Sequence, residues 1–248
     1  MRVLFMSPKK VELIIGPCAV ESYEQMEKIG KILSFYQIRY LRAGAYKPRT
    51  SPKSFQGMGK EGIEIIHEVA QKYNLLSVSE IMDVRDIDFM KDKIDILQVG
   101  SRNMYNYTLL KELGKVDNTI LLKRGLSATF EEFIEASEYI NVNGNNNIWL
   151  CERGIRTMEG ATRNTLDLSC VALLKQVISY PVVVDLSHSL GRKDIILPMA
   201  CAAIAAGADE LMVEVHPTPE KALSDSQQQL SITEFCQLYE KLEEEKYL

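Results

Sequence analysis

Four residues of the sequence carry side chains that together could bind a transition metal. They offer a thiol, an imidazole and two carboxylates, and they are Cys18, His188, Glu214 and Asp225. A set that mixes sulfur, nitrogen and oxygen suits Mn, Fe, Co or Zn better than Mg or Ca, which prefer all-oxygen shells. Taken singly, a cysteine such as Cys18 is more often a small buried hydrophobic residue. A site for one divalent transition metal ion therefore requires a fold that brings the four residues together.

A second group of candidate residues is basic, although the chain as a whole is acidic. Lys and Arg number 29 against 34 Asp and Glu, which gives a net charge of -5 and a pI near 5.4. This balance disfavours nucleic acid or an anionic membrane as a partner. A local cluster of cations can still bind phosphate and carboxylate groups. The candidates are Arg42, Lys47, Arg49, Arg102, Lys123, Arg124 and Arg153.

Lys123 leaves two chemical roles open. An unprotonated lysine can act as a Schiff-base nucleophile, as in barrel aldolases. Arg124 follows Lys123 directly, and the other candidate cations are expected to lie nearby. This surrounding positive charge favours a role in binding an anion over a role as nucleophile.

The elements that must position these residues are predicted by hydrophobic periodicity. Eight short β-branched runs alternate with amphipathic segments, and 248 residues divided by eight gives 31 per unit, close to the ~30 that a strand, a helix and two turns require. The α/β class is therefore indicated. The runs are VELIIG from 11, IRYLRAG from 38, LLSVSE from 75, DILQVG from 95, TILLKRG from 119, NIWLCERG from 147, PVVVDLSH from 181 and ELMVEVHP from 210, and the helices are expected at 22–36, 60–73, 83–91, 105–114, 129–140, 165–178, 193–206 and 231–245.

A closed (β/α)8 TIM barrel fits both the count and the even spacing of these units. An open doubly wound sheet is the alternative, but no GxGxxG follows the first strand. Catalytic residues of TIM barrels lie where the strands end, and polar or charged residues follow all eight runs. Strands one and eight become neighbours only when the barrel closes, so only closure brings Cys18 to Glu214. We expect a single catalytic domain spanning residues 1–248.

The cysteines and the N-terminus indicate a cytoplasmic setting. The five cysteines form no CxxC pair, and an odd number leaves at least one unpaired. The N-terminal MRVLFMSPKK lacks the apolar region of a secretory signal, and no run reaches the length of a membrane span. We interpret this segment as a remnant hairpin that covers the bottom of the barrel or joins a subunit contact.

Short motifs follow one another in a fixed order along nearly the whole chain. They are GPCAVES at 16–22, RAGAYKPRTSP at 42–52, VSE at 78–80, QVGSRNM at 98–104, LLKRG at 121–125, CERG at 151–154, DLSHS at 185–189, VEVHP at 213–217 and HPTPEKALSD at 216–225. In this order they resemble the phosphoenolpyruvate-condensing aldolase superfamily, and most closely its type I-beta 3-deoxy-D-arabino-heptulosonate 7-phosphate (DAHP) synthases.

The resemblance implies a metal-dependent condensation of phosphoenolpyruvate with erythrose 4-phosphate that releases phosphate, the first step of the shikimate route to aromatic amino acids. It implies that the metal ligands are Cys18, His188, Glu214 and Asp225. Cys18 and His188 are then also catalytic residues, together with Lys47 as a candidate proton donor. Supporting roles are expected for Glu80 and Asp185.

The resemblance also implies which residues bind the two substrates. Phosphoenolpyruvate is expected on Arg102, Lys123 and Arg153, with Ser101 beside them and with Arg42 and Lys47 near the substrate carboxylate. The KPRT motif includes Arg49 and Thr50, which are expected to bind the phosphate of the sugar.

Two alternatives remain open at this stage. Sister enzymes that make 3-deoxy-D-manno-octulosonate 8-phosphate from arabinose 5-phosphate typically carry KANRSS where this chain has KPRTSP at 47–52. The PR of this chain therefore favours the four-carbon sugar. A barrel that only senses a phosphorylated metabolite is disfavoured, because binding alone would require the cations but not a set of four metal ligands.

The resemblance further implies a homo-oligomer, either a tetramer or a dimer. Some members carry an additional N-terminal regulatory domain or a fused chorismate mutase, and we expect neither here. Tyrosine or phenylalanine should consequently leave the rate of the purified chain unchanged in a phosphate-release assay. Inhibition of the isolated chain by either amino acid would contradict this expectation.

Overall fold

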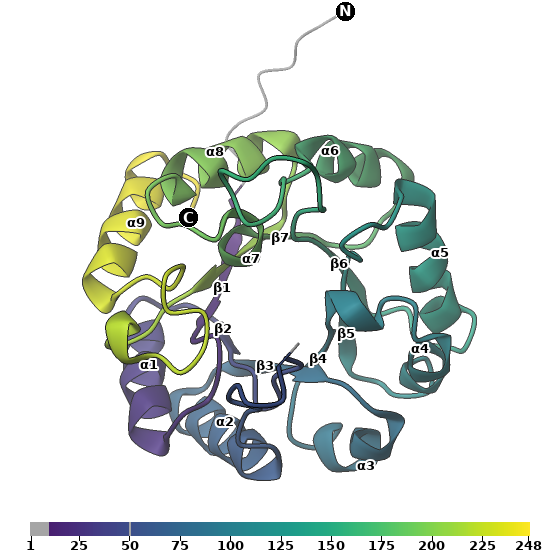
Figure 1. The fold of residues 1–248 in the computed structure, drawn as a ribbon, viewed down its shortest axis with the longest axis horizontal. Helices are drawn as coiled ribbons and strands as arrows, with labels where there is room; N and C mark the ends of the chain where they lie inside the picture. The colour runs from purple at the N-terminus through teal and green to yellow at the C-terminus, as the bar shows by residue number, and fades with distance from the viewer. Residues whose placement is uncertain (1–9, 50) are drawn as a thin grey trace, which may run out of the picture.

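Eight parallel strands close into a barrel in the part of the chain that the structure describes (Figure 1). The structure is a computed structural model, and it describes residues 10–49 and 51–248. Each strand pairs with the next, and β8 pairs with β1, so the predicted TIM barrel is confirmed. The strands are β1 (Glu12–Gly16), β2 (Tyr40–Arg42), β3 (Leu76–Ile81), β4 (Ile96–Val99), β5 (Thr119–Lys123), β6 (Ile148–Glu152), β7 (Val182–Asp185) and β8 (Glu210–Glu214).

Helices form an outer ring around the barrel, except for the short α7, which lies inside this ring at the end of β7 (Figure 1). Every predicted helix occurs within three residues of its expected ends, although the one expected at 83–91 is a short 3-10 turn followed by a single α-helical turn. The α-helices are α1 (Tyr23–Phe35), α2 (Lys60–Tyr73), α3 (Ile87–Met90), α4 (Tyr107–Leu113), α5 (Phe130–Asn141), α6 (Leu168–Val177), α7 (Leu186–Leu190), α8 (Ile196–Ala206) and α9 (Ile232–Glu244), and the 3-10 turns are η1 (Val84–Asp86), η2 (Ser101–Asn103) and η3 (Pro219–Lys221).

Local sequence determines where several of these helices begin. The side chains of Thr129 and Ser231 accept hydrogen bonds from the third helical N–H, and a glutamate at that position bonds back to the cap in both cases. These capping boxes satisfy N–H groups that the first helical turn leaves unpaired. The two helices therefore start directly after polar loop residues.

The run PVVVDLSH was predicted as one strand, and this prediction is wrong in its second half. Strand β7 ends at Asp185, whose side chain accepts a hydrogen bond from the His188 backbone N–H at 3.0 Å. Asp185 thus caps the short helix α7, which ends at Gly191 in the left-handed conformation. His188 consequently lies on a helical turn at the carboxyl end of the barrel.

Side chains alternate between the two faces of each strand, and this alternation fills the barrel in layers. One apolar layer inside the barrel takes a residue from every strand, namely Ile14, Tyr40, Val78, Ile96, Leu121, Cys151, Val183 and Met212. Two residues further along each strand, the inward positions are mostly polar, namely Gly16, Arg42, Glu80, Gln98, Lys123, Arg153, Asp185 and Glu214. The apolar layer therefore forms a floor beneath a charged layer at the carboxyl ends of the strands.

The N-terminal hairpin expected within residues 1–10 falls almost entirely on residues 1–9, outside the described part of the chain. The helices of residues 10–49 and 51–248 include none that is long and apolar enough to span a membrane.

Gly16 occupies the one position of the charged layer that leaves no room for a side chain. A Cβ atom at this position would lie 2.0 Å from the carbonyl oxygen of Arg42. Gly16→Ala should therefore lower the free energy of unfolding by at least about 2 kcal/mol, because strand backbone must shift. Gly160→Ala is the control, since a Cβ there meets nothing within 4 Å, and it should stay within about 0.5 kcal/mol of the wild type. Equal denaturant midpoints for the two variants would contradict this packing argument.

Candidate active site

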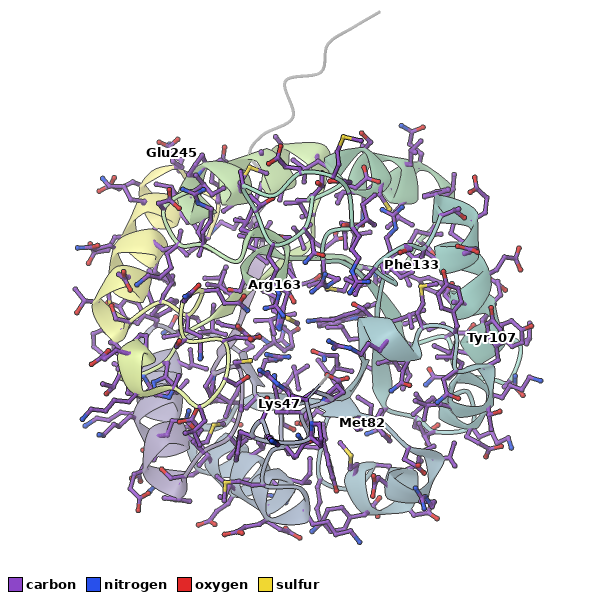
Figure 2. The ribbon with its side chains drawn as sticks, viewed as in Figure 1. Lys47, Met82, Tyr107, Phe133, Arg163 and Glu245 are labelled. Carbon is purple, nitrogen blue, oxygen red and sulfur yellow. The ribbon has the colours of Figure 1, made fainter. Side chains whose placement is uncertain are left out.

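A cavity of about 480 Å³ opens at the carboxyl ends of the strands. In Figure 2, Lys47 and Arg163 lie at the centre of the barrel, whereas Tyr107 and Glu245 lie at its periphery. The cavity is lined mainly by polar side chains, and six of the seven predicted cations are among them. These six are Arg42, Lys47, Arg49, Arg102, Lys123 and Arg153.

The four predicted metal ligands come together at one side of this cavity. One potential ligand atom from each residue lies within 4.8 Å of those of the other three. Cys18 follows β1, His188 lies on α7, Glu214 ends β8, and Asp225 lies in the loop after β8. The Cys18 and Asp225 side chains are 3.5 Å apart between Sγ and Oδ2, although 207 residues separate them in the sequence.

The Asp185 carboxylate orients the side chains of His188 and Lys123. One of its carboxylate oxygens, Oδ2, contacts His188 Nδ1 at 2.8 Å and Lys123 Nζ at 2.5 Å. Although burial by itself raises a carboxyl pKa, His188 and Lys123 hold the pKa of Asp185 well below its ordinary value. The ionised carboxylate therefore accepts the Nδ1–H of His188 and directs Nε2 toward the other candidate ligands.

The geometry around His188 Nε2 suits a bound cation. Burial lowers the pKa of His188 to about 4, so the imidazole is neutral at pH 7. With its proton on Nδ1, Nε2 is an acceptor, yet it faces a carboxylate oxygen of Glu214 at 3.3 Å and one of Asp225 at 4.0 Å. Three acceptors that face one another repel unless a cation lies between them. The residues present thus fit a metal ion of the kind predicted from their donor types.

Cys18 is the ligand whose protonation the metal would change. Burial, with a further contribution from Glu214, raises the pKa of its thiol to about 12. Lys47 Nζ donates to Cys18 Sγ at 2.9 Å and to the Cys18 carbonyl oxygen at 3.1 Å. A thiol must lose its proton to bind a metal, and the adjacent ammonium group stabilises the thiolate that results.

The two candidate carboxylate ligands are each held by an arginine. Arg42 donates to Glu214 Oε1 at 2.8 Å, and both side chains are almost completely buried. Arg163 donates to Asp225 Oδ2 at 3.0 Å. Burial opposes ionisation of both acids, but neighbouring positive groups lower the pKa of Glu214 and of Asp225 below their ordinary values. Both carboxylates are therefore ionised and able to bind a cation.

Three arginines of the cavity have no carboxylate partner within 4.0 Å among the described residues, and they are Arg102, Arg153 and Arg156. Arg153 is buried, and burial lowers its pKa, which reflects the cost of holding an uncompensated charge there. An anionic ligand would remove this cost. Lys123, in contrast, already contacts a buried carboxylate, which supports a role as a cation over the alternative role as a Schiff-base nucleophile.

One of the seven predicted cations lies outside the cavity. Arg124 does not line the cavity, because its guanidinium contacts Glu152 and Asp167 at 2.9 Å each behind the barrel wall. It follows the last residue of β5, and the alternation of the strand therefore turns it outward. Arg49 lines the cavity but lies on the metal side, where it donates to the Ser224 hydroxyl at 2.9 Å. Thr50 lies outside the described residues.

Ser101 lines the cavity as predicted, on the 3-10 turn that follows β4. Sequence reasoning missed Arg156 and Arg163, which line the cavity from the segment between β6 and α6. Both lie several residues beyond the end of β6, and the prediction covered only the first residues after each strand. The segment from 153 to 167 is longer than most connections between a strand and a helix, and its length was a signal that it folds over the site.

The fold and the cavity define a TIM-barrel protein whose active-site side combines a cation cluster with a candidate metal site. Residues 6–248 match the profile of the DAHP synthetase I family. A phospho-2-dehydro-3-deoxyheptonate aldolase of Thermotoga maritima is 47% identical over 230 residues, which cover 93% of this chain and 68% of that protein. The chain belongs to the DAHP synthetase I family.

Other relatives, at different levels of sequence identity, agree with this assignment. A crystal structure of the Thermotoga maritima DAHP synthase superposes with a TM-score of 0.91 at 46% identity and covers 95% of this chain and 69% of that one. A truncated form of the synthase from the same organism gives a TM-score of 0.88 at 42% identity, covering 95% and 86% of the two chains. A 2-dehydro-3-deoxyphosphooctonate aldolase of Syntrophotalea carbinolica is only 28% identical, over 93% of this chain and 88% of that protein.

Removing the sulfur ligand should weaken metal binding without unfolding the barrel. We expect Cys18→Ala to lower the affinity for Zn²⁺ or Co²⁺ by at least about 100-fold, because the set loses its thiolate. A competition titration against a colorimetric chelator measures the affinity, and Co²⁺ additionally reports thiolate ligation through its absorption spectrum. Cys236→Ala is the control, since Cys236 lies on α9 in the outer ring of helices. Equal affinities for the two variants would exclude Cys18 as a ligand.

Proposed function

We propose that the chain catalyses the condensation of phosphoenolpyruvate with D-erythrose 4-phosphate to DAHP and inorganic phosphate. Membership of the DAHP synthetase I family and the 47% identical aldolase support this activity. The observation that carries it is a cavity lined by arginines without a carboxylate partner among the described residues, next to four side chains that suit a transition metal, two of which, His188 and Asp225, also line it. This activity is the first step of the shikimate pathway, and the barrel is the unit that performs it.

Phosphoenolpyruvate binds across the cation side of the cavity. Its phosphate and carboxylate require several positive groups at fixed angles, and Arg102, Lys123 and Arg153 supply three of them. Ser101 adds a hydroxyl at the same side. Arg42 lies deeper, next to Glu214, and serves the end of the substrate nearest the metal site.

Erythrose 4-phosphate binds with its phosphate toward the KPRT segment, where Arg49 and Thr50 contact it. Arg49 contacts Ser224 and lies 3.8 Å from Asp225. A flexible arginine side chain can exchange this contact with a carboxylate for one with a phosphate. The aldehyde end of the sugar then points toward Cys18 and His188.

Cys18, His188, Glu214 and Asp225 hold one divalent metal ion, for which Mn, Fe, Co and Zn all suit the ligand types. When bound, such an ion supplies Lewis acidity that makes the aldehyde of the sugar electrophilic. His188 binds through Nε2 because Asp185 accepts the proton of Nδ1. Arg42 keeps Glu214 ionised and directed into the site.

Lys47 is the proton donor for the new hydroxyl group. Its ammonium is buried and lies 2.9 Å from Cys18 Sγ, beside the position of the aldehyde oxygen. As C3 of phosphoenolpyruvate bonds to the aldehyde carbon, negative charge develops on that oxygen, and Lys47 donates a proton to it. Positive charge develops at C2, and water adds there and loses one proton, which balances the proton that Lys47 donates. The C2–O bond to phosphate then breaks, the remaining hydroxyl proton leaves with the phosphate, and the ketone is formed.

The alternative substrate, arabinose 5-phosphate, is less well supported. Its synthases include relatives of only about 28% identity, whereas the 47% identical relative is the heptonate enzyme. The segment KPRTSP at 47–52 also lacks the KANRSS pattern of the five-carbon enzymes. We further infer a cytoplasmic homo-oligomer, a tetramer or a dimer, from the resemblance to these synthases.

A phosphate-release assay with purified protein distinguishes the two substrates. We expect turnover of phosphoenolpyruvate with erythrose 4-phosphate, little turnover with arabinose 5-phosphate, and loss of activity after dialysis against a chelator. Addition of Mn²⁺ or Zn²⁺ should restore the rate. Release of phosphate only with the five-carbon sugar would overturn the assignment of the substrate, and full activity after verified removal of metal would overturn the role of the four ligands.

A further inference from the structure

A buried glutamine connects the two carboxylate ligands of the candidate metal site. Gln228 is 3% exposed and lies in the loop after β8. Its Nε2 donates to Glu214 Oε2 at 2.6 Å, and its Oε1 accepts a hydrogen bond from Arg163 at 2.7 Å. The same nitrogen of Arg163 donates to Asp225 Oδ2. One amide thus joins Glu214, Arg163 and Asp225.

Exchanging the oxygen and the nitrogen of the Gln228 amide would lose both hydrogen bonds. A carboxylate accepts hydrogen bonds only and a guanidinium donates only, so the amide must present its NH2 group to Glu214 and its oxygen to Arg163. Because the amide is buried, a wrong orientation would leave both ends unsatisfied. Gln228 is therefore held in one orientation and holds its neighbours in turn.

This contact occupies one oxygen of Glu214, and Arg42 binds the other. Gln228 binds Oε2, whereas Oε1 accepts a hydrogen bond from Arg42 at 2.8 Å and lies 3.3 Å from His188 Nε2. Gln228 and Arg42 therefore fix the carboxylate together, with Oε1 on the side of His188. Partners of metal ligands that fix their orientation commonly contribute 10- to 100-fold to metal affinity.

Asp225 depends on the same amide through Arg163. The side chain of Arg163 is 39% exposed and would sample many rotamers in water. Its contact with Gln228 holds the guanidinium against Asp225, which has a left-handed backbone conformation with φ of 50°. Asp225 is therefore fixed both by its backbone and by the Gln228–Arg163 contact.

We propose that Gln228 is a positioning residue of the metal site, which orients Glu214 directly and Asp225 through Arg163 and so sets the affinity for the metal. The inference rests on the proposed function only in that the four residues bind a metal. Gln228 does not line the substrate cavity, so its effect should reach the reaction through the metal and not through substrate contacts.

The test replaces Gln228 by a side chain of similar length that cannot form hydrogen bonds. Gln228→Met should lower the affinity for Zn²⁺ by about 10- to 100-fold in chelator competition. At saturating metal, kcat should return to near the wild-type value with an unchanged KM for both substrates. Gln227→Met is the matched control, since Gln227 is the neighbouring exposed glutamine, and it should bind metal like the wild type.

A second comparison tests the connection through Arg163. The loss caused by Gln228→Met should be smaller in an Arg163→Met background, because one of its two routes to the ligands has already been removed. An equal loss in both backgrounds would overturn the route through Arg163. Thermal unfolding of the metal-free variants separates weakened metal binding from a damaged fold, and a lower affinity explained entirely by unfolding would overturn the positioning role.

The outcomes distinguish this inference from the proposed function. If the wild type binds metal and Gln228→Met binds it within about twofold of Gln227→Met, the inference on Gln228 fails while the metal site stands. If the wild-type protein binds no divalent transition metal, both fail. A KM for phosphoenolpyruvate that rises in Gln228→Met at saturating metal would replace the positioning role by a role in substrate binding.

Discussion

Closure of the barrel is the constraint on which the site depends. Strand β1 pairs with β8 along its whole length, from Glu12 opposite Glu210 to Gly16 opposite Glu214. This pairing brings the beginning of the chain to its last strand, and Cys18 thereby reaches Glu214 and Asp225. An open sheet would separate β1 from β8 and hold Cys18 away from Glu214 and Asp225. The same parallel register directs all eight carboxyl ends to one side, where the cations also gather.

The charged layer is stable because most of its charges are paired across the barrel. Arg42 contacts Glu214, and Lys123 contacts Asp185, each pair almost completely buried. Burial of single ions would be costly, whereas paired and hydrogen-bonded ions are tolerated. Against this background, the buried Arg153 has no carboxylate partner in the part of the chain described. The paired charges of this layer therefore stabilise the mouth of the barrel. Its unpaired positive group is available to an anionic substrate.

The candidate site combines residues from the strand ends with residues from two long loops. The strand ends supply Arg42, Lys123, Asp185 and Glu214, but Asp225, Arg163 and Gln228 come from the long segments after β6 and β8. These segments meet above the site through the contacts of Arg163 with Asp225 and Gln228. TIM barrels commonly combine a rigid ring of strands with such loops. Here the rigid ring and the loops each provide part of the candidate metal site.

The sequence by itself determined the elements, the barrel and the residues at the ends of the strands, because strand alternation and regular unit length are local patterns. It also determined the four metal-ligand candidates, once their motifs had been set beside those of a known family. Only the tertiary structure decided the contacts: that Arg124 faces away from the cavity, that His188 lies on a helical turn capped by Asp185, and that Arg163 and Gln228 reach the ligands. These outcomes depend on side-chain direction and on contacts between loops far apart in the chain, which neither composition nor spacing records.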